Sequence, residues 1–181
     1  GTINTSGTVN TTNGALYDGW AGAISMSARN VNVTTTLTAF SRAAATYGNQ
    51  YNGNVSVTNT NTVVDASNVG IGGVISGYGF TKSGVGLLKL SGVNTYTFTT
   101  TIAGGTLQLG SGTTIPDASD VSLTSSGSVL DMNGYSETIN TLSSTFTQSV
   151  VGSSGSGSYT LTIGTGGGTN AQNSKVYNGI L

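Results

Sequence analysis

Short segments in which apolar and polar residues alternate recur along most of the chain. The apolar–polar–apolar triplets lie at 31–33, 55–57, 88–90, 107–109, 121–123, 130–132 and 161–163. Alternation with a period of two residues is typical of a β-strand that buries one face. Glycine and Asn-Gly pairs flank many of these triplets, as at Asn133-Gly134, and they supply turn conformations at low steric cost. The pattern predicts an all-β protein made of many short strands.

The spacing of the triplets separates two architectures. Leu88-Lys89-Leu90 and Leu107-Gln108-Leu109 are offset by 19 residues, and the triplets at 31–33 and 55–57 are offset by 24. Repeats of roughly 20 to 30 residues are typical of solenoids, in which each strand pairs with the equivalent strand one coil later. Ser, Thr and Asn can stack on one another along such an axis without the repulsion of stacked charges. We therefore predict a β-solenoid over residues 1–181 as a single domain, with a β-sandwich or barrel of hairpins as the alternative.

The segment 14–51 departs from this pattern. Four of its residues have the spacing i, i+3, i+7, i+10 of one helical face, and these are Leu37, Phe40, Ala44 and Tyr47. Thr36 or Thr38 could cap such a helix. We predict an irregular segment here, either a short helix or a bulky loop that covers a coil end or one face. Its aromatic residues are predicted to be buried together, with a surface that stacks on sugar rings as the alternative; they are Tyr17, Trp20, Tyr47 and Tyr51.

The composition narrows the set of partners. Only 6% of the residues are charged, against about a quarter in an ordinary protein, and the net charge is −1. The 35% of hydrophobic residues, arranged in alternating runs, indicate a folded chain. The basic residues are scattered rather than gathered in a patch, which excludes nucleic acid as a partner; they are Arg29, Arg42, Lys82, Lys89 and Lys175. No apolar run approaches the ~18 residues of a membrane-spanning helix.

Residues that carry chemistry are few. The chain has no histidine and no cysteine, which removes the usual nucleophile–base pairs and nearly all zinc sites. The one local acidic group could bind Ca²⁺ or supply a glycosidase carboxylate pair, but turn positions explain it better; it comprises Asp117, Asp120, Asp131 and Glu137. We therefore predict no catalytic, cofactor-binding or metal-binding residue, and no enzymatic activity.

Residues 72–164 carry a family resemblance. The matching segments are "ISGYGFTKSGVGLLKLSGVNTYTFTTTIAGGTLQLGSG", "IPDASDVSLTSSGSVLDMNGYSETINTLS" and "SYTLTIG". They resemble the autotransporter-associated β-strand repeat of bacterial surface proteins. The resemblance implies a right-handed parallel β-helix in an exported, non-catalytic stalk. One departure is Phe98, which stands where the repeat has glycine and is expected to anchor a coil corner or a contact. Residues 1–70 are not covered by the resemblance.

The two ends of the sequence suggest further contacts. "NSKVYNGIL" at 173–181 echoes "ASNVGIGGVI" at 66–75, so another repeat is expected to begin within 170–181. Either the sequence was cut from a longer array, or its last coil is completed by the uncharged first strand, "GTINTSGTVN", of another copy.

Three functions follow from these features. The first is a β-helical stalk or adhesin-type passenger at the bacterial cell surface or outside the cell. The second is a subunit of an extracellular filament that joins end to end, so that its partner is a second copy. The third is a module that binds or cleaves polysaccharide in a lateral groove, with a polysaccharide or a host surface as its ligand.

Overall fold

The computed structural model describes residues 2–5, 9–10, 23–39, 53–63 and 68–164, which form strands β1 to β18 and no helix. The first sheet contains β1 (Thr2–Thr5), β4 (Asn30–Val33), β7 (Gly70–Ile71), β10 (Leu87–Leu90), β12 (Thr106–Leu109), β14 (Val129–Asp131) and β17 (Val150–Gly152). The second sheet contains β3 (Ile24–Ala28), β6 (Val55–Asn59), β9 (Phe80–Ser83), β11 (Thr100–Ile102), β13 (Asp120–Leu123) and β16 (Thr141–Ser144). The third sheet contains β2 (Val9–Asn10), β5 (Leu37–Thr38) and β8 (Ile75–Ser76), and β15 (Glu137–Ile139) pairs with β18 (Leu161–Ile163).

The sheets are stacks of parallel strands that belong to successive coils. Every strand pair among the described residues is parallel. In the first sheet Leu88 pairs with Leu107, Leu107 with Leu130, and Leu130 with Val151. This register confirms the predicted β-solenoid, and it excludes the sandwich, whose hairpins would make neighbouring strands antiparallel.

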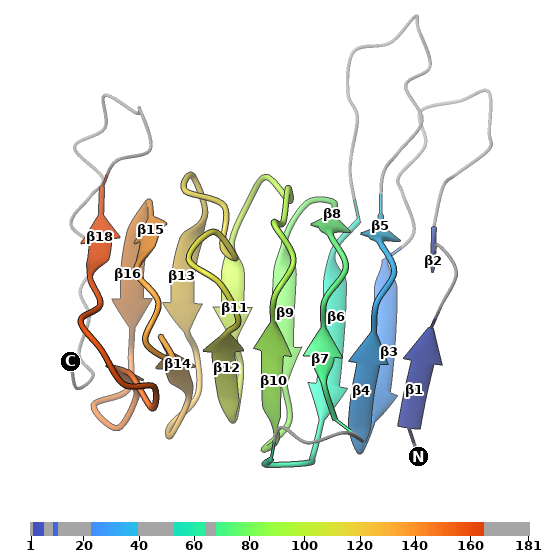
Figure 1. Ribbon diagram of the computed structural model, residues 1–181, viewed down its shortest axis with the longest axis horizontal. Helices are drawn as coiled ribbons and strands as arrows, with labels where there is room; N and C mark the ends of the chain where they lie inside the picture. The colour runs from blue at the N-terminus through green and yellow to red at the C-terminus, as the bar shows by residue number, and fades with distance from the viewer. Residues whose placement is uncertain (1, 6–8, 11–22, 40–52, 64–67, 165–181) are drawn as a thin grey trace, which may run out of the picture.

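The solenoid is right-handed. In Figure 1 the chain runs upward through the front strands, over the top into the second sheet, and downward behind. It then returns to the front one position further to the left, toward the C-terminus. Rotation in this sense with this advance defines a right-handed helix, the hand that parallel crossovers adopt almost without exception.

Aliphatic side chains fill the interior between the sheets. In β10, β12 and β13 every second residue points inward and is buried. Leu88, Leu107 and Leu130 are completely buried. The buried hydrophobic residues form one continuous core from Ile24 to Val151. Burial of this apolar surface is the main stabilising contribution to the fold.

Two of the predicted copies do not stack on each other. Val31 in β4 pairs with Ile3 of the first sheet, whereas Val55 in β6 pairs with Ile24 of the second sheet. The predicted stacking of 31–33 on 55–57 is therefore wrong. Each coil contains more than one triplet, and strands of both sheets bury alternate residues, so the triplet pattern alone does not identify the sheet to which a copy belongs.

The described part of the segment 14–51, residues 23–39, forms β3, β4 and β5. The predicted helix is wrong at its start, because Leu37 and Thr38 form β5 and pair with Ile75 and Ser76. Leu37 is completely buried and its N–H donates to Val74 O at 2.8 Å, so pairing with the next coil overrides the local helical spacing. The rest of that prediction, with Phe40, Ala44 and Tyr47, lies outside the described residues, as does the echo at 173–181.

Candidate functional site

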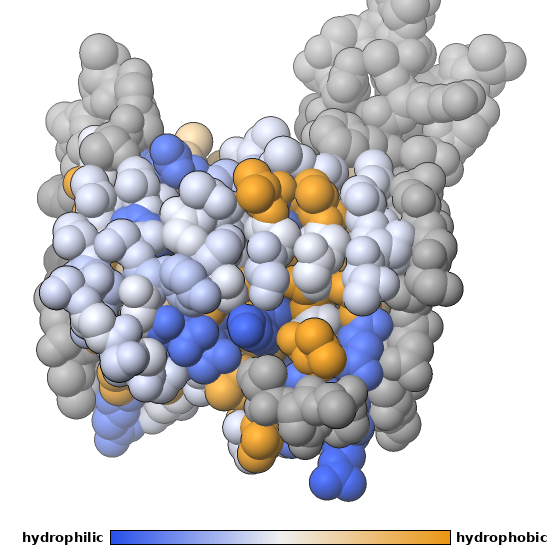
Figure 2. All heavy atoms as spheres, in the orientation of Figure 1, coloured by the Kyte–Doolittle hydropathy of each residue, from blue (hydrophilic) through white to orange (hydrophobic). Residues whose placement is uncertain are grey.

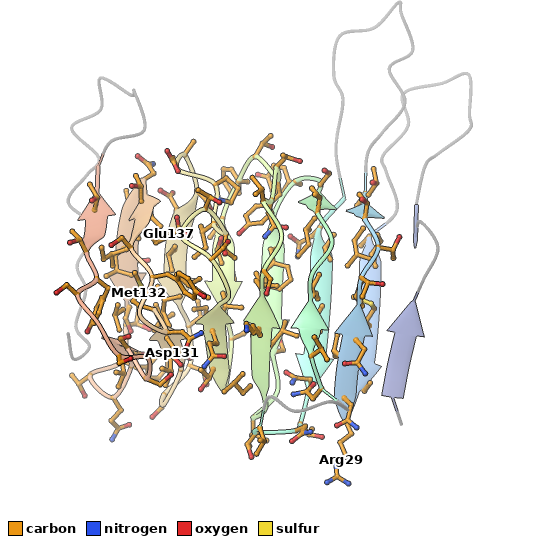
Figure 3. The ribbon with its side chains drawn as sticks, viewed as in Figure 1. Arg29, Asp131, Met132 and Glu137 are labelled. Carbon is orange, nitrogen blue, oxygen red and sulfur yellow. The ribbon has the colours of Figure 1, made fainter. Side chains whose placement is uncertain are left out.

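The four acidic residues of the predicted group do not converge. Asp117 is exposed beyond Pro116, and Asp120 in β13 accepts hydrogen bonds from Asn140 Nδ2 and Thr141 Oγ1 at 2.8 and 2.6 Å. Asp131 lies on the first sheet and Glu137 on a different wall of the solenoid (Figure 3). Across the part of the chain that the structure describes, no three acidic residues are close enough to hold a metal ion.

Asp131 is engaged on both carboxylate oxygens. Its Oδ1 accepts from the backbone N–H groups of Asn133 and Ser154 at 2.9 and 2.8 Å. Its Oδ2 accepts from Gln108 Nε2 and Ser154 Oγ at 2.8 and 2.5 Å. Burial alone would raise the pKa of Asp131, but these four donors outweigh it and lower the pKa below its ordinary value. The carboxylate therefore holds the turn after β14 and the loop after β17 against the first sheet.

The hydrogen bonds of Asp131 predict a pH-dependent loss of stability in Asp131→Asn. At pH 7 the variant should unfold with about 1–3 kcal/mol less free energy, because an amide nitrogen would face donors that the carboxylate accepts from. A carboxyl with a lowered folded pKa stabilises the fold above its unfolded pKa, and this stabilisation is lost as the pH falls through the folded value. The difference from the wild type should therefore shrink below about pH 4.

Urea unfolding followed by circular dichroism between pH 7 and pH 3 measures this difference. Asp117→Asn, which removes the same charge from an exposed turn, serves as the control. A difference that stays constant over this pH range would contradict the role given to the Asp131 carboxylate.

Glu137 fixes the turn that precedes it in the stack. Its Oε2 accepts from the backbone N–H groups of Thr114 and Ile115 at 2.9 and 3.0 Å, and its Oε1 accepts from Thr138 N–H at 3.1 Å. The residue is 3% exposed, and this burial raises its pKa. Three backbone N–H groups therefore hold the carboxylate, and two of them link Glu137 to the preceding coil.

Lys82 is a lysine inside the core. It is completely buried in β9, in register between Val57 and Ile102 of the neighbouring coils. Its Nζ donates to the backbone carbonyls of Ser83, Gly84 and Gly104 at 2.9, 2.9 and 3.0 Å. Burial lowers the pKa of Lys82 to about 8. The three carbonyl oxygens match the three donors of an ammonium group, so Lys82 joins the corners of two adjacent coils.

The outer face of the first sheet carries mixed polar groups. Lys89, Gln108 and Asp131 are neighbours in register on it. Figure 2 shows this side of the molecule, on which hydrophilic and near-neutral residues predominate and hydrophobic residues stand in small separate groups. Of the other basic residues, Arg29 lies near the N-terminal end of the stack (Figure 3), and Arg42 and Lys175 lie outside the described residues.

The outer face of the second sheet carries a row of hydroxyl groups, one from each coil. We call it the hydroxyl row; its members, in register from coil to coil, are Ser25, Ser56, Thr81, Thr101, Ser122 and Ser143. Each occupies an outward position between two inward ones of its strand, and each is exposed or half-buried. Ser143 Oγ donates to Ser122 Oγ at 3.2 Å. The row continues along the axis over six coils.

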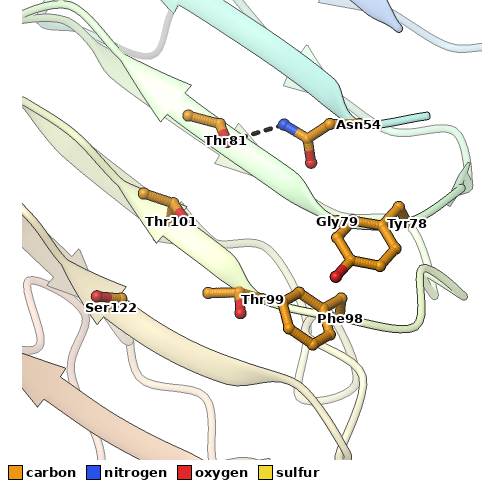
Figure 4. Close-up of a pocket in the computed structure, with 8 residues that line it drawn as sticks. All are labelled: Asn54, Tyr78, Gly79, Thr81, Phe98, Thr99, Thr101 and Ser122. Carbon is orange, nitrogen blue, oxygen red and sulfur yellow. Dashed lines mark hydrogen bonds between the residues drawn. The ribbon is translucent and has the colours of Figure 1, made fainter. Parts of the chain in front are cut away.

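Two aromatic rings stand at one end of the strands that carry the middle of this row. Tyr78 and Phe98 stack with ring centroids 4.5 Å apart and planes inclined by 22°. Their side chains are 45% and 50% exposed. An open groove of about 460 Å³ connects the rings to the hydroxyl row (Figure 4). Its lining residues are Asn54, Tyr78, Gly79, Thr81, Phe98, Thr99, Thr101 and Ser122.

Among the residues of this groove, the sequence predicted a contact role for Phe98 alone. It assigned Phe98 to a coil corner or a contact, which agrees with the stacking on Tyr78, but it did not pair the two rings. The signal was present, since Tyr78 and Phe98 lie 20 residues apart, the same offset as Phe80 and Thr100, which pair between β9 and β11. The aromatic set singled out earlier, Tyr17, Trp20, Tyr47 and Tyr51, lies outside the described residues.

Comparison with known proteins leaves the family open. No family model, no curated protein and no solved structure matches the chain. The resemblance to the autotransporter-associated repeat therefore stays a prediction. In the described residues there is no helix with the length and apolar character needed to cross a bilayer.

Proposed function

We propose that this chain is a non-catalytic structural segment of a protein at the bacterial cell surface or outside the cell, a β-helical stalk of the kind its repeat resembles. The observation that carries the proposal is the continuous core and parallel pairing from coil to coil. The seven strands of the first sheet span about 29 Å at a spacing of ~4.8 Å, so that each added coil lengthens a rod. A solenoid of this kind would hold its far end away from the point at which the protein is attached to the cell.

The polar residues of the interior support a mechanical role. Two buried ionisable side chains are held in place by backbone groups, since Glu137 accepts from three N–H groups and Lys82 donates to three carbonyls. An active site requires such groups to converge on a substrate. Here they connect one coil to the next.

The surface location is tested with an epitope inserted after Gly127 in the source bacterium. Gly127 lies in an exposed turn where an added side chain meets no atom within 4 Å, so the insertion should leave the stack intact. We expect antibody to label intact cells, with a cytoplasmic protein as the unlabelled control. Labelling that requires permeabilised cells would overturn the surface location.

An end-to-end filament is the second candidate. Within the described residues, β1 pairs only with β4 and β17 pairs only with β14. In the filament, the outer edge of β17 in one copy would pair with the outer edge of β1 in the next. Such edges are templates for pairing, and head-to-tail pairing without closure forms a fibre. Sedimentation velocity and electron micrographs at rising protein concentration distinguish the candidates. Regular fibres favour the filament, and a monomer at all concentrations favours the stalk.

A further inference from the structure

We propose that the hydroxyl row and the Tyr78–Phe98 pair form a binding site for a neutral, extended polysaccharide, which lies in the groove along the solenoid axis. This binding function goes beyond the structural role and does not depend on it. The combination that points to it is a stacked aromatic pair exposed beside a continuous row of hydroxyl groups.

The aromatic pair supplies an apolar surface of the right shape. Phe80 and Tyr96, which lie two residues from Tyr78 and Phe98, are buried, whereas Tyr78 and Phe98 are about half exposed. The two rings already cover one face of each other, and a flat partner packed against the exposed part of either side chain would bury further apolar area. A pyranose ring offers such a partner, because its axial C–H bonds form a flat apolar face.

The groove floor supplies the polar half of the interaction. Thr81, Thr101 and Ser122 come from three successive strands and lie in line across them (Figure 4). Each hydroxyl can donate one hydrogen bond and accept others, as sugar hydroxyls do. The row repeats at the strand spacing of ~4.8 Å, so it offers polar contacts along the length of a chain rather than around one terminal sugar.

Asn54 adds a fixed amide to this floor. Its Nδ2 donates to Ser56 Oγ at 3.1 Å and to Thr81 Oγ1 at 2.9 Å, which orients the side chain. The amide oxygen is thereby directed toward the groove (Figure 4). A preoriented acceptor beside the hydroxyl row lowers the entropic cost of binding a sugar hydroxyl.

The charge of the groove selects a neutral chain. None of its eight lining residues is an aspartate, glutamate, lysine or arginine. An acidic polysaccharide is normally bound through arginine or lysine, which pair with its carboxylate or sulfate groups. A second groove lies on the first sheet, and it differs in charge because its lining includes the carboxylate of Asp131. The second sheet therefore fits a glycan built from uncharged hexoses.

Affinity electrophoresis in native gels tests the site with defined probes. The neutral probes are hydroxyethyl cellulose, galactomannan and a mixed-linkage β-glucan, and the acidic probe is polygalacturonate. We expect at least one neutral polysaccharide to retard the wild type, with little effect of polygalacturonate. The double variant Tyr78→Ala/Phe98→Ala should bind that polysaccharide about tenfold more weakly or worse.

Two further variants separate binding from folding. Tyr135→Ala removes an exposed aromatic residue outside the groove and should bind as the wild type does. Thr101→Val keeps the shape of the side chain and the β-propensity but removes the hydroxyl from the row, and it should weaken retardation while circular dichroism stays unchanged.

Several results would overturn the proposal. These are no retardation in any neutral gel, retardation by polygalacturonate alone, and full retardation of a folded double variant. A fourth is self-association that the double variant loses in the absence of any glycan effect, which would show that this face binds a second copy of the chain.

Discussion

Leu88→Ala should lower the free energy of unfolding by about 2–5 kcal/mol. Leu88 is completely buried in β10 and stands in register with Leu107, so its side chain packs within one continuous column of the core. The strands above and below are fixed by parallel hydrogen bonds, and the cavity left by three missing carbon atoms can close only in part. Equilibrium unfolding in guanidinium chloride, followed by circular dichroism, measures the loss.

The neighbouring residue provides a matched control. Leu87 lies in the same strand but faces outward, where it is half-buried beside Thr106. Leu87→Ala removes the same atoms and should cost less than about 1 kcal/mol. Similar losses for the two substitutions would mean that the inward and outward faces of β10 are assigned wrongly.

Gly105→Ala should destabilise the fold by about 2–5 kcal/mol, and for a different reason. Gly105 has φ +61°, a conformation that L residues adopt at a cost. In addition, a Cβ atom here would lie 2.3 Å from the carbonyl oxygen of Gly86 in the preceding coil. That oxygen accepts the backbone hydrogen bond from Thr106, so it cannot move away without breaking the pairing.

Gly127→Ala separates the cost of the positive φ angle from the cost of the steric clash. Gly127 has a similar φ of +72°, but no atom lies within 4 Å of the position of an added Cβ. It should therefore show only the conformational cost, about 1–2 kcal/mol. Thermal unfolding of both variants gives the difference, which reports how closely successive coils approach at Gly105. Equal losses would contradict that close approach.

The repeat was readable from the sequence where a coil is short and regular. Between Leu88 and Leu107 the spacing, the alternation and the flanking glycines all agree, and the structure pairs these two residues. The prediction of secondary structure was wrong where the local spacing of residues favours a helix but pairing with the next coil favours a strand. Leu37 has helical spacing to its neighbours in sequence, yet its partner is Ile75 on the next coil, and no local pattern encodes that contact.

The groove was only partly predictable for a related reason. The alternation predicts that Thr81, Thr101 and Ser122 face outward, but it does not say that they share one register. That register depends on how many residues each corner contains, and corner lengths vary. The stacking of Tyr78 on Phe98 follows from the same register, so it could be found only once the pairing of β9 with β11 was known.

The number of residues per coil differs along the stack. Val33 and Ile71 pair across 38 residues, whereas Leu88 and Leu107 pair across 19, and both pairs contribute to the same core. Both spacings bring aliphatic residues into one buried core, so the number of residues between paired strands can vary while the stack of aliphatic side chains continues. In such a fold the buried aliphatic positions of the strands must stay apolar, whereas the segments between strands can change in length and sequence. New loops can therefore be added one coil at a time.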